Sequence, residues 1–147
     1  MPLRLVVPLL LLVPLAACTM GRPKERINPP TLSVQELRVE AGQCLLRLRL
    51  HNHSTVRMRF SDVELATLDL GGRALGPLVL APGLDVPPTS AEPFDHVVPC
   101  PGLDAAAGEH AYHLAGRIVA SEPRGQRFQV SWRSRLLPVP GLAGVYR

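Results

Sequence analysis

Residues 46–51 alternate strictly between leucine and a charged or polar residue, in the order Leu46-Arg47-Leu48-Arg49-Leu50-His51. Successive side chains of a β-strand point to opposite faces, so this order gives one apolar face and one charged face. An antiparallel strand that covers a core has this character. The segment therefore predicts a strand over residues 44–51 whose leucines point inward.

The same period of two returns along most of the chain and predicts about seven strands. They cover residues 32–41, 44–51, 56–70, 74–80 and 94–99, with two long strands around 112–118 and 128–132. Phase changes inside 56–70 predict β-bulges, and Gly71-Gly72 predicts a hairpin turn. The proline-rich stretch 81–93 predicts a loop that cannot pair as a central strand. Since no long helix is indicated, the pattern predicts an all-β, two-layer antiparallel sandwich.

The amino terminus predicts export and lipid attachment. Arg4 precedes an apolar run over residues 5–17, which is shorter than the ~20 residues needed to span a bilayer and is typical of a signal peptide. The run closes on Leu15-Ala16-Ala17-Cys18, which resembles the lipobox of bacterial lipoproteins. We predict that residues 1–17 are a lipoprotein signal peptide and that Cys18 carries the lipid. An ordinary secretory peptide with an incidental cysteine is the alternative.

Acyl chains on Cys18 would attach the mature protein to a membrane without spanning it. Thr19 stands where the sorting signals of Gram-negative lipoproteins would place aspartate for retention at the inner membrane. That resemblance implies the outer membrane, facing the periplasm. Residues 18–30 are polar and contain prolines, which predicts a tether between the lipid and one folded domain over residues 31–147.

The three cysteines divide into one lipid carrier and one pair. With Cys18 taken by the lipid, Cys44 and Cys100 remain together in an oxidising compartment, where a disulfide is possible. The sequence leaves open whether their Cα atoms come close enough to bond.

The formal charge of +4 does not predict a nucleic-acid surface, because basic and acidic residues are interspersed along the chain. Most arginines of the predicted strands fall on outward positions, where they keep sheet faces and edges soluble. These are the arginines at 47, 49, 57, 59, 133 and 135. The alternative is that this stripe contacts anionic lipid head groups near the anchor.

The sequence predicts no catalytic set, no metal site and no cofactor. His51 and His53 would share one strand face, but no acidic or cysteine partner stands at ligand spacing from them. There is no nucleophile with a glycine elbow, and the carboxylates at 62, 64, 69 and 95 are scattered. We therefore expect no enzyme activity.

Three further residues have simple structural interpretations. His110 and His113 stand at a junction between a loop and a strand and are expected in solvent. Trp132 alternates with Phe128 and Val130, so it is expected in the core rather than at a binding surface.

Three stretches of the chain resemble the late-embryogenesis-abundant group 2 domain, also called the water stress and hypersensitive response (WHy) domain. They are the alternating strand with its asparagine turn (46–54), the hairpin over 68–76, and the Pro-rich loop with the strand that follows it (86–99). The family typically has Asn-Pro-Asn at the turn, where this chain has Asn52-His53-Ser54. The resemblance covers roughly residues 30–135. It implies an immunoglobulin/fibronectin III-like β-sandwich without enzymatic activity or cofactor, and a role in water stress.

These observations favour a lipid-anchored, non-enzymatic protein of the cell envelope that acts as a stabilising or interaction module. A first alternative is an envelope assembly or transport accessory that binds a protein partner by adding a strand to an exposed sheet edge. A second is a carrier that holds a lipid or another apolar ligand between the sheets. A sandwich filled with side chains argues against the carrier, and a covered edge argues against strand addition.

Overall fold

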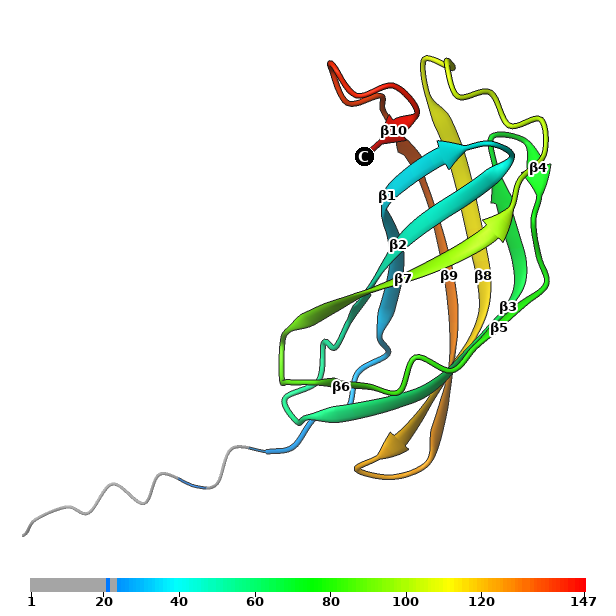
Figure 1. Ribbon diagram of the computed structural model, residues 1–147. Helices are drawn as coiled ribbons and strands as arrows, with labels where there is room; N and C mark the ends of the chain where they lie inside the picture. The colour runs from blue at the N-terminus through cyan, green and yellow to red at the C-terminus, as the bar shows by residue number, and fades with distance from the viewer. Residues whose placement is uncertain (1–20, 22–23) are drawn as a thin grey trace, which may run out of the picture.

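The computed structural model describes residue 21 and residues 24–147, and this part of the chain forms two antiparallel β-sheets packed as a sandwich (Figure 1). One sheet has the strand order β10-β1-β2-β7, and the other has the order β4-β3-β8-β9, with β5 and β6 also paired to β3. The strands are β1 (Thr31–Glu40), β2 (Gln43–His51), β3 (Met58–Leu70), β4 (Arg73–Ala74), β5 (Leu78–Leu80), β6 (Leu84–Val86), β7 (Ala91–Pro99), β8 (His110–Glu122), β9 (Gln126–Leu136) and β10 (Val145–Tyr146).

The all-β sandwich predicted from the alternation is confirmed, but the described residues form ten strands rather than about seven. The predicted strand 74–80 is divided into β4 and β5 around Gly76-Pro77, because proline has no N–H to donate to a ladder. β6 and β10 are short strands that the pattern did not indicate. In this part of the chain, no helix has the length and apolar character needed to cross a membrane.

The alternating leucines of β2 point into the space between the sheets, as predicted. Leu46, Leu48 and Leu50 are fully buried, whereas Arg47 and Arg49 are exposed. Buried apolar residues of β1, β3 and β8 complete the same cluster. Burial of each large aliphatic side chain stabilises the fold by about 1.5–3 kcal/mol. The interior of the described sandwich is thus filled by the protein's own side chains.

β3 carries the predicted irregularities. Its pairing with β8 shifts register between Arg59 and Phe60, again before Asp62, and once more between Leu65 and Thr67. The hairpin that follows β3 turns at Gly71-Gly72, and both glycines have positive φ. A two-residue hairpin turn needs this conformation, which glycine adopts without steric cost.

The stretch predicted as a loop, 81–93, contains more regular structure than expected. β6 forms inside it and pairs with β3, and β7 begins at Ala91 rather than at residue 94. Pro93 is accommodated because β7 is the edge strand of its sheet, so one side of its backbone needs no partner.

His110 is buried, so the expectation that it lies in solvent is wrong. It is 2% exposed, and its ring packs against the edge of Tyr146 with ring centroids 4.4 Å apart. Tyr146 belongs to β10, which pairs with β1 and is distant in sequence from His110. His113 is half-buried on the outer face of β8.

Cys44 and Cys100 are joined by a disulfide, with their Cα atoms 5.7 Å apart. The bond links the start of β2 to the residue that follows β7. Beside it, the backbone N–H of Cys100 donates to the carbonyl of Gly42 at 2.8 Å. Covalent and backbone contacts therefore fix the same corner of the four-stranded sheet.

Candidate functional site

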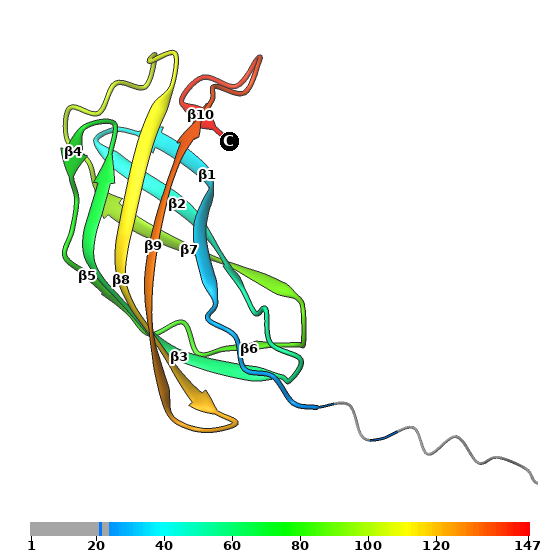
Figure 2. The same ribbon diagram turned by 180° about the vertical axis from the view of Figure 1, so that it is seen from behind.

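The clearest functional feature is β9, an edge strand with one long unpaired side. Its eleven residues pair with β8 in unbroken register. Among the described residues, no backbone hydrogen bond joins the other side of β9 to a further segment. In Figure 2, β9 runs beside β1, which belongs to the opposite sheet. A row of backbone N–H and C=O groups is therefore available to an added strand.

The other sheet edges in the described part carry features that discourage pairing. β7 contains Pro93 and Pro99. β1 has a bulge between Val34 and Glu36 and is capped beyond it by β10. The outer side of β3 is occupied by β4, β5 and β6. Proline, bulges and short covering strands are the usual protections of an edge, and β9 has none of them.

Trp132 lies at the rim of the sandwich, beside this open edge. It lines a groove of about 180 Å³ between residues 30–32 and 129–132. Because it is 43% exposed, the prediction that it lies in the core is wrong. Trp132 does share the inner face of β9 with Phe128 and Val130, as the alternation indicated. The opposite sheet, however, does not extend past β1 at this point, which leaves the groove open.

Tyr112 of β8 closes the core next to the groove. Its hydroxyl accepts a hydrogen bond from the backbone N–H of Val34 at 3.2 Å. Burial raises the pKa of Tyr112, while hydrogen bonding to Val34, Trp132 and Ser134 acts in the opposite direction. Tyr112 is thus a neutral phenol held between the two sheets.

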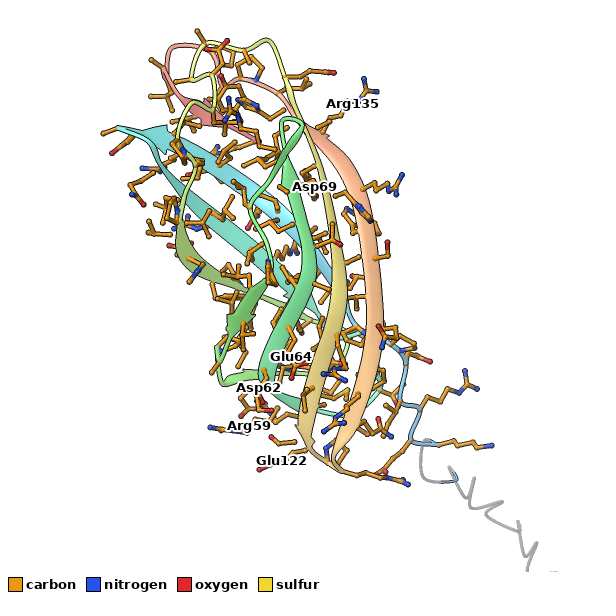
Figure 3. All side chains as sticks on the ribbon, turned by 90° about the vertical axis from the view of Figure 1, so that its right-hand side faces the viewer. Arg59, Asp62, Glu64, Asp69, Glu122 and Arg135 are labelled. Carbon is orange, nitrogen blue, oxygen red and sulfur yellow. A yellow bond between two sulfur atoms is a disulfide. The ribbon has the colours of Figure 1, made fainter. Side chains whose placement is uncertain are left out.

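The charged side chains on the outer face of the six-stranded sheet are mainly acidic on β3, with Arg59 as the exception, and all basic on β9. Figure 3 shows Asp62, Glu64 and Asp69 along β3 and Arg135 on β9. β9 also contributes Arg127 and Arg133 to this face and contains no Asp or Glu. The unpaired edge is therefore also the basic edge of the sheet.

All six arginines predicted to face outward are exposed, which confirms that expectation; they are the arginines at 47, 49, 57, 59, 133 and 135. On β9, Arg135 lies 3.5 Å from Glu109. Within the described residues, Arg127 and Arg133 form no ion pair. Two of the three β9 arginines are therefore free to meet a carboxylate from another molecule.

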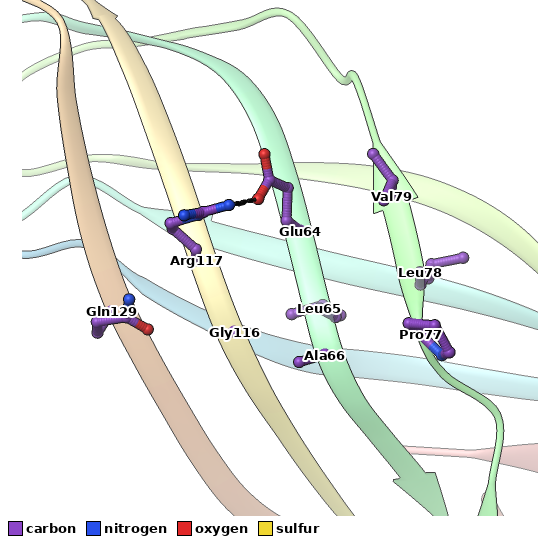
Figure 4. Close-up of a pocket in the computed structure, with 9 residues that line it drawn as sticks. All are labelled: Glu64, Leu65, Ala66, Pro77, Leu78, Val79, Gly116, Arg117 and Gln129. Atoms are coloured by element: carbon purple, nitrogen blue, oxygen red, sulfur yellow. Dashed lines mark hydrogen bonds and ion pairs between the residues drawn. The ribbon is translucent and has the colours of Figure 1, made fainter.

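A second hollow, of about 320 Å³, lies on the outer face between β5, β3 and β8 (Figure 4). Glu64 and Arg117 form an ion pair there, with Arg117 Nε donating to Glu64 Oε2 at 2.9 Å. The carboxylate of Glu64 and the guanidinium of Arg117 therefore neutralise each other. Val79, which also lines the hollow, is 73% exposed. Gln129 is the remaining polar side chain of the lining. These residues include no nucleophile with a neighbouring base, so the hollow does not favour catalysis.

Glu36 is a buried carboxylate on the outer side of the other sheet, where it faces Arg47 across the ladder. It accepts hydrogen bonds from Arg38 Nε at 2.6 Å and from Arg147 Nε at 2.8 Å. The hydrogen bond from Arg38, followed by that from Arg147, lowers the pKa of Glu36. Since both its oxygens are engaged, this carboxylate holds the C-terminal residue against β1 rather than offering a binding group.

Asn52 connects two of the stretches that carry the WHy resemblance. Its side-chain N–H₂ group faces the carbonyl oxygens of Val56, Val86 and Pro87 at 2.8, 3.1 and 3.1 Å. Its Oδ1 accepts from the backbone N–H of Ser54 at 2.9 Å. Asn52 is fully buried, so this amide fixes the turn after β2 against β6 and the loop that follows it.

The remaining predicted site residues are placed as follows. Cys18 and the signal peptide lie outside the described residues. The rings of His51 and His53 are 4.0 Å apart, and His53 Nε2 lies 2.9 Å from Thr31 Oγ1. Burial, with a smaller effect of His51, lowers the pKa of His53. No group of three or more His, Cys, Asp or Glu side chains in the described part could hold a metal ion.

No protein-family model matches the chain, and no curated protein matches it. The chain is similar to the solution structure of AT1g01470 from Arabidopsis thaliana, with a TM-score of 0.46 and 18% sequence identity over 78% of this chain and 80% of that chain. It is also similar to the crystal structure of a protein from Archaeoglobus fulgidus, with a TM-score of 0.44 and 11% identity over 78% of this chain and 98% of that chain.

Proposed function

We propose that this chain is a lipid-anchored, non-enzymatic interaction module of the bacterial cell envelope, and that it binds a protein partner by strand addition at β9. The observation that carries the proposal is the unpaired side of β9, an eleven-residue strand without proline or bulge. Residues 131–135 are all exposed, so both faces and the edge of this segment are accessible. Main-chain hydrogen bonds supply affinity in strand addition, and alternate side chains supply specificity.

The beginning of the described chain supports a short link to the anchor. The backbone N–H of Arg26 donates to Thr55 Oγ1 at 2.8 Å, and that of Asn28 donates to Ser54 Oγ at 2.9 Å. Contacts with the sandwich therefore begin before the predicted domain boundary at residue 31. The eight steps along the chain from Cys18 to Arg26 span at most about 28 Å when fully extended. Acyl chains on Cys18 would thus hold Arg26, where the contacts with the sandwich begin, within this distance of the membrane surface.

The packed interior gives no support to the alternative of a lipid carrier, because apolar side chains from both sheets occupy the space between them. A stabilising role in water stress, as the WHy resemblance implies, is the second candidate. The contact at Asn52 joins two of the stretches that carry this resemblance. Its test is the activity that a dried enzyme recovers after drying with the purified domain, compared with an equal mass of serum albumin.

The lipid anchor is tested by metabolic labelling with a palmitate analogue in the producing cell. The wild-type chain should be labelled and recovered in the membrane fraction, and the Cys18→Ser variant should be unlabelled and released. Label on the variant, or an unlabelled wild-type chain, would remove the anchor from the proposal.

Strand addition is tested in the same cells with a photo-crosslinking amino acid at Ser131. The control places it at Gln43, which is also exposed but lies in the other sheet. We expect one crosslinked protein at 131 and none at 43, and slower hydrogen exchange of β9 amides in the isolated complex. Equal crosslinking at both positions, or β9 amides that exchange as in the free protein, would contradict the proposal.

A further inference from the structure

Building on the proposed function, we infer that the strand added to β9 is a partner segment in which acidic and small apolar residues alternate. Its carboxylates face the row formed by Arg127, Arg133 and Arg135, and its apolar side chains face Trp132. The proposal therefore assigns the chemistry of the partner and excludes a second copy of this chain at the same edge.

The charge requirement follows from the neighbours of the three arginines within the sheet. On β8, the residues directly opposite Arg127, Arg133 and Arg135 are Val119, His113 and Ala111. None of these three side chains is acidic, and the carboxylate of Glu109, just before β8, is paired with Arg135 at 3.5 Å. Arg127 and Arg133 form no ion pair in the described part of the chain. Side chains directly opposite each other on adjacent strands lie about 4.5–5.5 Å apart at Cβ, and opposite charges there stabilise the pair. Acidic residues on an added strand would occupy the equivalent positions on the open side.

A second copy of β9 does not meet this requirement. In an antiparallel β9–β9 pair centred on Ser131, Arg127 would face Arg135 of the other copy. In a pair centred on Arg133, that arginine would face its own counterpart. These two registers therefore bring arginines together. Because β9 contains no Asp or Glu, self-pairing in any register leaves its arginines without a carboxylate. An acidic strand, in contrast, places carboxylates opposite these arginines.

The other face of the added strand meets the rim of the core. Phe128 and Val130 are half-buried against the core, and Trp132 is 43% exposed above the groove. The groove has a volume of about 180 Å³ and includes Leu32 of β1. This volume fits side chains the size of valine or threonine, and burying them against Trp132 adds apolar area to the main-chain hydrogen bonds.

A simpler role for the arginines is to keep an exposed edge soluble. Charge of either sign would keep the edge soluble, whereas binding an acidic strand requires positive charge at these positions. The two roles are separated by reversing the charge of β9 while keeping its solubility, in the double variant Arg127→Glu, Arg133→Glu. Both residues are exposed and form no ion pair in the described part, so the double variant breaks no salt bridge seen there.

The probe is a synthetic nine-residue peptide, Glu-Val-Glu-Thr-Glu-Val-Glu-Thr-Glu, with blocked ends. A second peptide replaces every Glu by Arg. A third keeps every Glu but has Pro at its fourth and sixth positions, which removes two backbone N–H donors and prevents an extended ladder. Trp132 is the only tryptophan of the sequence, so its fluorescence reports binding at this site directly. Titrations use the full mature chain in detergent.

We expect the acidic peptide to shift the emission of Trp132, with the Arg peptide and the Pro peptide each binding at least about tenfold more weakly. The charge-reversed variant should lose about tenfold in affinity for the acidic peptide and gain affinity for the Arg peptide. Its unchanged thermal unfolding would show that the fold is intact.

Equal binding of the acidic and Pro peptides would mean general charge attraction and would overturn the inference. Equal binding of the acidic and Arg peptides would also overturn it, but strand addition at β9 would stand. No response of Trp132 to any peptide would overturn the assigned chemistry, while crosslinking from position 131 decides separately whether β9 is the binding edge.

Discussion

The hydroxyl of Tyr112 lies 3.2 Å from the backbone nitrogen of Val34 and joins the two sheets across the edge of the core. Val34 stands immediately before the bulge of β1, where the regular pairing with β2 is interrupted. Tyr112 comes from β8 and is 5% exposed. A single phenol therefore provides a backbone N–H with a partner at the point where the ladder shifts register.

Replacing this phenol should destabilise the sandwich. In Tyr112→Phe the N–H of Val34 stays buried without an acceptor, so we expect a loss of about 1–2 kcal/mol in the free energy of unfolding. Urea denaturation measures it. The control is Tyr146→Phe, whose hydroxyl donates to the half-buried carbonyl of Ala107 at 3.1 Å. That carbonyl can be reached by water after the change, so the loss should be smaller. Equal losses in the two variants would contradict this account.

The long strands are predictable because their signal is local. The alternation of β2 can be read within six residues, and the register shifts of β3 follow from phase changes inside one strand. β10 has only two residues and forms by pairing with β1, more than a hundred positions away. The packing of Tyr146 of β10 against His110 depends on the same long-range pairing. Structure that depends on a distant partner leaves no periodic trace in the chain.

The candidate site was missed for a related reason. The alternation correctly assigns Trp132 to the inner face of β9, but it does not tell which strand is the last of its sheet. Which strand is last depends on the order of all the strands in the sheet. In this order β9 lies at an edge, so the rim beside Trp132 stays open. The cluster at Glu36 likewise joins residues 111 positions apart.

Breaking the disulfide should weaken the domain more than any single hydrogen bond. Cys44 and Cys100 are 56 residues apart, and the loss of loop-closure entropy in the unfolded chain corresponds to about 4 kcal/mol. We expect that loss in the double variant Cys44→Ala, Cys100→Ala, measured by urea denaturation. A reductant should destabilise the wild-type domain equally and leave the variant unchanged. A reductant effect on the variant would mean that another process is being measured.

The ion cluster at Glu36 should make stability depend on acid. Because Arg38 and Arg147 lower the pKa of Glu36 in the folded state, its contribution is present above the pKa of an unfolded glutamate. That contribution is lost as the pH falls through the lower, folded value. Glu36→Gln should therefore destabilise the domain at pH 6 and have a smaller effect at pH 2.5. Urea titrations at both pH values test this, with the exposed Glu40→Gln as the control.

The buried amide of Asn52 offers the most selective test of the packing between β2 and β6. Its N–H₂ group faces three carbonyl oxygens, and its own oxygen accepts from Ser54 N–H. Asn52→Ala removes these bonds and leaves their partners buried, which should cost about 3 kcal/mol.

Asn52→Asp keeps the size of the side chain but replaces the N–H₂ donor with a carboxylate oxygen that faces those carbonyl oxygens. At pH 7 it should therefore destabilise the domain more than Asn52→Ala does. Burial and the facing carbonyls favour the protonated acid, which can still donate one hydrogen bond. Its folded pKa is therefore raised, and the variant should gain stability relative to Asn52→Ala as the pH falls below 7. Asn28→Asp is the matched control, since Asn28 is exposed and donates to the His53 carbonyl at 2.8 Å. Thermal unfolding between pH 4 and pH 7 measures the stability of all three variants. If Asn52→Asp were as stable as the wild type at pH 7, the amide protons of Asn52 would not hold this turn.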